Sequence, residues 1–118
     1  MKAVVIDDHP KSLKQVIGAL RSFPWEMDVT GFEDGKQALQ FMKQQPVSLA
    51  VMETNIGGTD GVELARQIRD LQPAIYIVFV TDNPSRALDA FKVRADGYLL
   101  KPADAPALRG AIMVGDIA

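Results

Sequence analysis

Short apolar runs alternate along this chain with segments whose apolar residues recur at the spacing of a helix. The runs have the length of strands and lie at residues 3–6, 27–32, 47–52, 74–80 and 98–100. The helical segments are marked by Leu13, Val16, Ile17 and Leu20, by Ala38, Phe41 and Met42, by Gly61, Leu64, Ala65 and Ile68, by Ala87, Leu88 and Phe91, and by Leu108, Ala111 and Ile112. The pattern therefore predicts five strands, each followed by a helix.

The central runs are apolar throughout instead of alternating with polar residues. Such strands are buried on both faces, which is typical of a parallel sheet covered by helices on both sides. Pro10, Pro84 and Pro106 fall near predicted helix starts, where the missing N–H of proline costs little. We expect a small doubly wound α/β domain, in which ligands bind beyond the carboxyl ends of the strands.

Composition narrows the class of protein. With 118 residues, 47% of them hydrophobic, the chain suits one compact domain over residues 1–118. A net charge of −2 lacks the basic surface of a nucleic-acid-binding domain, and there are no cysteines for disulfides or thiolate chemistry. The longest apolar run, residues 74–80, is too short for a bilayer, and the start of the chain lacks the layout of a signal peptide. We therefore expect a soluble, cytoplasmic domain with no direct contact to nucleic acid or membrane.

Polar residues stand directly after four of the apolar runs. They are Asp7 and Asp8 after the first, Glu53 and Asn55 after the third, Thr81 after the fourth and Lys101 after the fifth. Carboxylates that converge at one sheet edge are costly unless they are neutralised, which leaves three alternatives: a bound divalent metal, a raised carboxyl pKa, or Lys101 as the counter-ion. Carboxylates with a backbone carbonyl suit Mg²⁺, which usually binds together with a phosphate. Thr81 and Lys101 would then hold phosphate oxygens, as phosphoryl transfer to a carboxylate requires.

Each of these motifs has a simpler interpretation when it is taken alone. Asp7-Asp8 and Thr81-Asp82 are typical of helix N-caps, and Lys101-Pro102 is typical of a turn. The prediction of a site therefore depends on their joint occurrence, in order, at the strand ends.

Four other features receive structural interpretations. His9 beside the acidic pair invites a phosphohistidine or metal-ligand role, but a lone histidine at a helix start is expected to be a solvated residue. Gly57-Gly58 is expected to form a turn, because no Lys-Ser/Thr pair follows as in a phosphate-binding loop. Tyr98 suits either simple packing or a functional role. The methionines Met27, Met42, Met52 and Met113 are expected to fill the core.

Together these motifs resemble the receiver domains of two-component response regulators. "VVIDDHP" is similar to the acidic strand end of that family, "FVTDNP" to its hydroxyl-bearing strand end, and "GYLLKP" to its lysine-proline signature. The spacing of "DGVEL" after the third run also agrees, and the similarity covers nearly the whole chain. The segment from Thr81 to Lys101, in which the two residues stand 20 positions apart, most resembles receivers of LytTR-type transcription regulators. The resemblance implies a flavodoxin-like sheet with strand order 2-1-3-4-5.

The resemblance also implies a role for each strand-end residue. Asp7 and Asp8 would bind Mg²⁺, together with the phosphoacceptor side chain at position 53 and the backbone carbonyl of Asn55. Thr81 and Lys101 would contact the phosphoryl group, Tyr98 would be the aromatic switch that follows Thr81, and the Lys101-Pro102 bond would be cis. Phosphoryl groups would come from a sensor histidine kinase or a phosphotransfer protein.

Position 53 departs from the family, which carries its phosphoacceptor aspartate there. Glu53 carries one more methylene, which moves the carboxylate by roughly 1.5 Å, and an error of about 1 Å can slow a positioned reaction about a hundredfold. Gly57 likewise replaces the usual proline four residues later. Glu53 thus either mimics the phosphorylated state, leaves an inert pocket in a scaffold, or is a substitution introduced to mimic activation.

The function predicted is a signalling switch and not an enzyme: a receiver domain with impaired or mimicked phosphorylation, whose output domain, if any, lies outside this sequence. The competing class is a phosphorylation-independent pseudo-receiver that binds a partner. Homodimerisation would use the fourth helix, fifth strand and fifth helix. A haloacid dehalogenase-type enzyme is disfavoured, because its D-x-D motif is absent.

Overall fold

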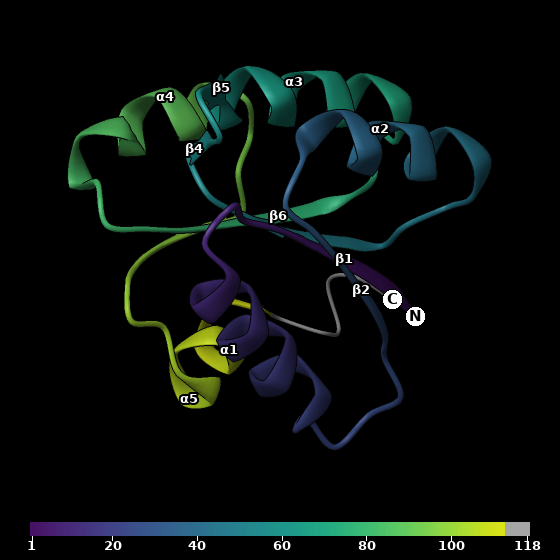
Figure 1. The fold of residues 1–118 in the computed structure, drawn as a ribbon, viewed down its shortest axis with the longest axis vertical. Helices are drawn as coiled ribbons and strands as arrows, with labels where there is room; N and C mark the ends of the chain where they lie inside the picture. The colour runs from purple at the N-terminus through teal and green to yellow at the C-terminus, as the bar shows by residue number, and fades with distance from the viewer. Residues whose placement is uncertain (113–118) are drawn as a thin grey trace.

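The computed structural model describes residues 1–112 and contains a five-stranded parallel sheet between two layers of helices (Figure 1). The strands are β1 (Lys2–Ile6), β2 (Asp28–Phe32), β3 (Leu49–Met52), β6 (Tyr76–Thr81) and β7 (Gly97–Leu100), and their order is β2-β1-β3-β6-β7. The helices are α1 (Pro10–Arg21), α2 (Gly35–Gln44), α3 (Gly61–Leu71), α4 (Ala87–Lys92) with a preceding 3-10 turn (Pro84–Arg86), and α5 (Ala105–Ala111). This order corresponds to 2-1-3-4-5 for the five predicted strands, which confirms the fold class.

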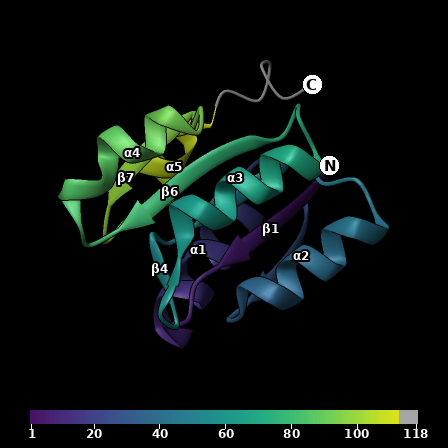
Figure 2. The ribbon, with the colours of Figure 1, turned by 90° about the horizontal axis from the view of Figure 1, so that it is seen from above.

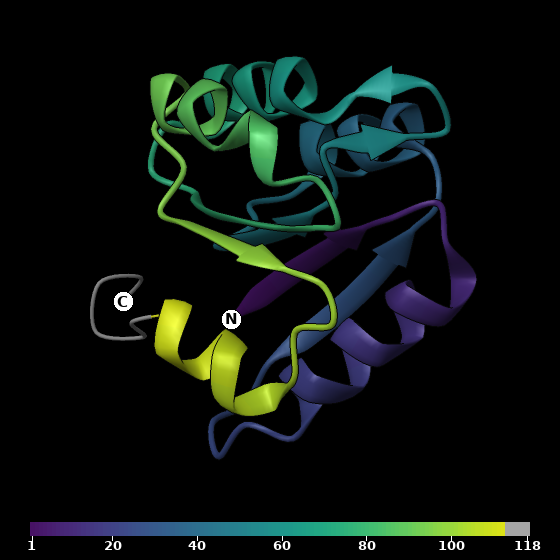
Figure 3. The same cartoon turned by 90° about the vertical axis from the view of Figure 1, so that its left-hand side faces the viewer.

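Two helix layers cover the sheet. Helices α2, α3 and α4 lie side by side over one face (Figure 2), and α1 and α5 cover the other (Figure 3). Successive residues of β1 serve both layers, because Val4 and Ile6 pack under α2 and α3 whereas Ala3 and Val5 pack against α1. Each fully buried aliphatic side chain of this kind stabilises the fold by about 1.5–3 kcal/mol.

Strands β3 and β6 begin later than their apolar runs predict. The third run spans residues 47–52, yet β3 begins at Leu49, and the fourth run spans 74–80, yet β6 is Tyr76–Thr81. The Val47 N–H is held by the side chain of Gln72, at 2.7 Å, and not by a neighbouring strand. Apolar character predicted burial at these positions correctly, but the hydrogen-bond partner decides where a strand starts.

Helix α4 exists as predicted, but two of the three residues that marked it face outward. Ala90 is buried, whereas Leu88 is 76% exposed and Phe91 is 56% exposed. Of the predicted core methionines, Met42 and Met52 are buried and Met27 is partly buried against the core. The prediction for Met113 lies outside the described residues.

A short antiparallel hairpin, β4 (Asn55–Ile56) and β5 (Thr59–Asp60), follows β3 and leads into α3. Gly57 and Gly58 form its two-residue turn with φ values of 58° and 86°, a conformation that glycine adopts without steric cost. The turn predicted for this pair is confirmed. The two short strands around the turn were not predicted from the sequence.

Candidate functional site

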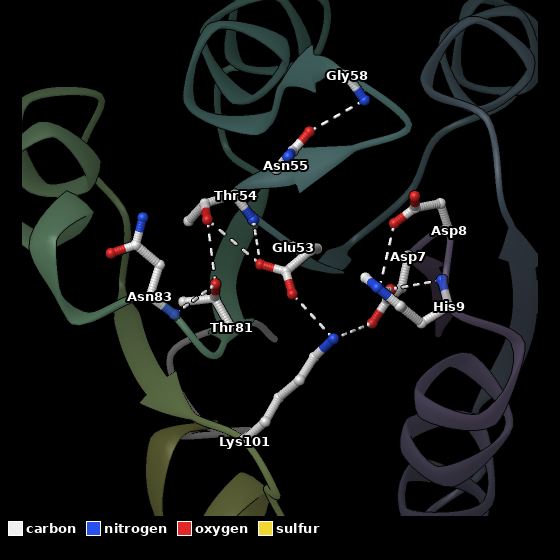
Figure 4. A network of polar contacts seen from close by, with 10 residues as sticks. All are labelled: Asp7, Asp8, His9, Glu53, Thr54, Asn55, Gly58, Thr81, Asn83 and Lys101. Carbon is white, nitrogen blue, oxygen red and sulfur yellow. Dashed lines mark hydrogen bonds and ion pairs between the residues drawn. The ribbon is translucent and has the colours of Figure 1, made fainter.

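The predicted side chains meet where β1, β3, β6 and β7 end (Figure 4). Asp7 follows β1, Glu53 follows β3, Thr81 is the last residue of β6, and Lys101 follows β7. We call Asp7, Asp8, Glu53, Thr81 and Lys101 the strand-end site. Parallel strands present their carboxyl ends at the same edge, so residues far apart in the sequence converge here.

Lys101 lies between two carboxylates. Its Nζ is 2.9 Å from Asp7 Oδ2 and 2.8 Å from Glu53 Oε2, and all three side chains are largely buried. Burial alone would lower the pKa of Lys101, but the hydrogen bonds to Glu53 and Asp7 outweigh burial and raise the pKa above its ordinary value. Lys101 therefore stays charged and serves as the counter-ion, one of the three alternatives that the sequence left open.

The second oxygen of Glu53 is held by the residue that follows it. Glu53 Oε1 accepts a hydrogen bond from Thr54 N–H at 2.7 Å and from the Thr54 hydroxyl at 3.2 Å. Burial alone would raise the pKa of Glu53, but the donors of Lys101, Thr81 and Thr54 hold the pKa below its ordinary value of 4.5. Both carboxylate oxygens are thus engaged, and a raised carboxyl pKa is excluded for Glu53.

Thr81 is linked to Glu53 through a hydroxyl chain. Its Oγ1 lies 3.0 Å from Thr54 Oγ1, which in turn reaches Glu53, and it accepts a hydrogen bond from Asn83 N–H at 3.1 Å. The carboxylate at position 53 is therefore coupled to the loop that follows β6.

The opposite side of the strand-end site is an acidic group that His9 joins. Asp7 Oδ1 accepts the His9 backbone N–H at 2.9 Å, and His9 Nδ1 lies 3.1 Å from Asp7 Oδ1 and 3.3 Å from Asp8 Oδ1. One ligand atom from each of the three residues lies within 4.8 Å of the others. Asp8 Oδ1 is a buried atom, although the Asp8 side chain is 32% exposed, and the His9 ring nitrogen is its polar neighbour. Two carboxylates beside an imidazole nitrogen fit a divalent cation.

Asn55 stands apart from this acidic group. It is exposed, and its side-chain oxygen accepts the Gly58 N–H at 3.0 Å within the hairpin. Glu53 also faces Lys101 and Thr54 and is not a member of the group. The metal-binding roles implied for Glu53 and for the Asn55 carbonyl remain predictions.

Tyr98 on β7 is half-buried and points toward the loop after β6. Its hydroxyl donates a hydrogen bond to the backbone carbonyl of Asn83, and its ring centroid lies 6.0 Å from that of Phe79. Burial raises the pKa of the Tyr98 hydroxyl. Asn83 thus contacts Thr81 through its N–H and Tyr98 through its carbonyl. The Lys101-Pro102 bond, predicted to be cis, is cis.

Sequence reasoning missed Thr54 and Asn83, and it gave His9 only a structural role. Thr54 could have been suspected, because a hydroxyl residue directly after a buried carboxylate can reach it. Asn83 acts through its backbone, which residue identity does not reveal.

The comparisons with known proteins agree on one class. A family model described as the response regulator receiver domain matches residues 3–113. The transcriptional regulatory protein YpdB of Escherichia coli is 30% identical over 103 residues, which cover 86% of this chain and 42% of YpdB. The transcriptional regulatory protein LytR of Staphylococcus aureus is 26% identical over 102 residues, which cover 86% of this chain and 42% of LytR.

Two solved structures have the same fold. The crystal structure of the response regulatory domain of MrkE from Klebsiella pneumoniae gives a TM-score of 0.84 at 28% identity and covers 94% of this chain and 91% of that one. A response regulator from Burkholderia pseudomallei, crystallised with a phosphorylated aspartic acid, calcium ion and citrate, gives 0.84 at 24% identity and covers 98% of this chain and 68% of that one.

This class is the signalling domain that two-component response regulators carry. The chain belongs to the response regulator receiver domain family. Its curated relatives include LytTR-type transcription regulators, as the sequence predicted, and the chain spans less than half of their length. Receiver domains interact with histidine kinases or phosphodonors, bind a divalent cation at an acidic pocket, and are typically not enzymes. Within residues 1–112, no helix is long and apolar enough to cross a membrane.

Proposed function

We propose that Glu53 occupies the phosphoacceptor position and holds this receiver domain in an arrangement that resembles the phosphorylated state. One observation carries the proposal: the carboxylate already makes the contacts that a phosphoryl group would seek. Glu53 Oε2 is 2.8 Å from Lys101 Nζ, and Oε1 accepts from Thr54. Charge-assisted contacts of this kind are the strong ones in a buried site.

The same contacts make phosphorylation of Glu53 inefficient. A nucleophilic oxygen must face the incoming phosphorus, yet both oxygens of Glu53 are bound to donors. Turning one oxygen toward a phosphodonor would break either the Lys101 contact or the Thr54 contacts.

Tyr98 carries the state of the site to the surface. Its hydroxyl bonds to the carbonyl of Asn83, whose N–H bonds to Thr81, and Thr81 reaches Glu53 through Thr54. A change at Glu53 would therefore disturb Tyr98 and the start of α4.

We infer that the strand-end site binds Mg²⁺ through Asp7 and Asp8, with the Asn55 carbonyl and Glu53 as further ligands. Three carboxylates against one ammonium leave an excess of negative charge that a divalent cation neutralises. Asp8 Oδ1 supports this assignment, because it is a buried carboxylate atom that, within residues 1–112, no protein group other than the His9 ring approaches within the distance of an ion pair or hydrogen bond. When bound, the ion supplies charge neutralisation for a phosphoryl group.

Intact mass after incubation with Mg²⁺ and acetyl phosphate tests the phosphoacceptor assignment. We expect no phosphoryl adduct on the native chain, an adduct on Glu53→Asp, and none on the control Glu53→Ala. An adduct on the native chain would overturn the positional argument. Absence of an adduct from Glu53→Asp would favour a pseudo-receiver that acts without phosphorylation.

The surface of α4 and β7 supports a further role as a binding face. Leu88, Phe91 and Leu100 are more than half exposed, and Asp89 and Lys92 supply both signs of charge. A patch that combines apolar and oppositely charged residues can complement itself across a two-fold axis. We propose that a second copy of the domain occupies it, in a transcription regulator controlled by a histidine kinase.

A further inference from the structure

We infer that His9 is a third protein ligand of the metal site, so that the site prefers a late first-row transition-metal dication, such as Zn²⁺, over Mg²⁺. The inference rests on the metal site of the proposed function. It adds a nitrogen ligand to an oxygen site, and nitrogen changes which metal fits best.

The contacts of the three carboxylates divide the strand-end site into two halves. Lys101 occupies Asp7 Oδ2 and Glu53 Oε2, and Thr54 occupies Glu53 Oε1. The carboxylate atoms directed away from Lys101 are Asp7 Oδ1 and Asp8 Oδ1, and His9 Nδ1 lies 3.1 Å and 3.3 Å from these two atoms (Figure 4). A cation that these two oxygens attract therefore meets an imidazole nitrogen, whereas Glu53 would have to release a contact with Lys101 or Thr54 to join it.

The local backbone holds the main chain of His9 beside Asp7, while its side chain is 63% exposed. Its N–H is bonded to Asp7 Oδ1 at 2.9 Å, and Pro10 follows as the first residue of α1. Small closing movements would bring Nδ1 and the two oxygens to about 2.0–2.2 Å from a shared ion.

The donor types then decide the metal. Mg²⁺ prefers oxygen ligands in octahedral geometry, whereas imidazole suits Zn²⁺, Ni²⁺ and Cu²⁺. The chain has one histidine and no cysteine, so no other imidazole or thiolate side chain competes for such an ion.

Calorimetric titrations with Zn²⁺ and with Mg²⁺ test the assignment. We expect His9→Asn to weaken Zn²⁺ binding by about tenfold or more and to leave Mg²⁺ binding unchanged. Asp8→Asn should weaken both, and the control Lys14→Ala on the exposed face of α1 should weaken neither. A direct readout is the ¹⁵N resonance of His9 Nδ1, which should move on Zn²⁺ addition and stop moving at one equivalent.

The outcomes separate the two proposals. If His9→Asn binds Zn²⁺ as the native chain does, or if the Nδ1 resonance stays in place, His9 is not a ligand, and the inference fails while the Mg²⁺ site stands. If Asp8→Asn retains both affinities, the metal site of the proposed function fails as well.

Discussion

At the scale of single residues, the proposal depends on the one methylene by which Glu53 is longer than an aspartate. The longer side chain reaches Lys101 Nζ at 2.8 Å and Thr54 N at 2.7 Å. Because glutamate offers two acceptor oxygens and one charge, it reproduces only part of what phosphate supplies.

This arrangement predicts how stability depends on pH. The pKa of Glu53 is lower in the folded than in the unfolded chain, so its ionised form stabilises the fold. That contribution is complete above the unfolded pKa near 4.5 and is lost as the pH falls through the folded pKa. We expect Glu53→Gln to be less stable than the native chain at pH 7, with the difference shrinking below pH 4.5.

Urea unfolding at a series of pH values measures that difference. All other ionisable side chains are the same in both proteins, so the comparison isolates Glu53. If the difference in unfolding free energy between the two proteins stays constant down to pH 3, the contact with Lys101 does not stabilise the ionised form of Glu53.

The strand-end site illustrates what residue identity can predict. Asp7, Glu53, Thr81 and Lys101 were found because charged and hydroxyl residues interrupt apolar runs at strand ends. The sequence could not predict that the oxygens of these carboxylates divide between two partners, some contacting Lys101 and others contacting His9. This division depends on which carboxylate oxygen each donor reaches. That choice is set by side-chain rotamers and by the turn into α1.

At the scale of elements, the passage from β3 through the hairpin into α3 fixes the position of Glu53. The N–H of Gly61 donates to the Thr54 carbonyl at 2.7 Å, and Asp60 caps α3 through the N–H of Val62. A Cβ on Gly61 would lie 2.1 Å from the Glu53 carbonyl oxygen. Only glycine allows the helix start to approach the backbone this closely.

We therefore expect Gly61→Ala to destabilise the fold by about 1–3 kcal/mol, because the backbone at Glu53 must move. Gly18→Ala is the matched control: Gly18 lies in the interior of α1 with nothing within 4 Å, so alanine should stabilise by about 0.5–1 kcal/mol. Thermal unfolding of both variants gives the comparison. Equal effects would refute the close approach.

The positions of the strands could be predicted from the sequence, because burial decides them. The orientation of a helix was harder to predict, because it depends on how the helix packs against the sheet. The apolar runs located all five strands of the sheet. The same pattern predicted helix α4 but not its inward face: Leu88 and Phe91 share a helical stripe that faces solvent, while the small Ala90 packs inward. A stripe shows that a helix has an apolar face but does not say what covers it.

At the scale of the whole molecule, the strand-end site lies at the carboxyl ends of the strands. The surface formed by Leu88 and Phe91 of α4 and Leu100 of β7, which we call the α4–β7 face, lies beside it. If that face binds a second copy, replacing its apolar side chains should separate the copies without unfolding the domain. We expect the double variant Leu88→Ser, Phe91→Ser to sediment as a monomer where the native chain associates. Its stability should stay within about 0.5 kcal/mol, as is usual for exposed positions.

Leu71→Ser is the control for that experiment, since Leu71 is an exposed apolar residue on α3. It should leave association unchanged. A native chain that sediments as a monomer at all concentrations would remove the dimer proposal.

The most direct test of the mimicry itself is the environment of Tyr98. The chain has two tyrosines, so fluorotyrosine labelling gives two ¹⁹F resonances, and Tyr98→Phe identifies the one that matters. We predict that the Tyr98 resonance of the native chain coincides with that of Glu53→Asp treated with Mg²⁺ and beryllofluoride, and differs from that of untreated Glu53→Asp. A native resonance that coincides with untreated Glu53→Asp, and shifts away from it only in the beryllofluoride sample, would contradict the claim that Glu53 stands in for a phosphorylated aspartate.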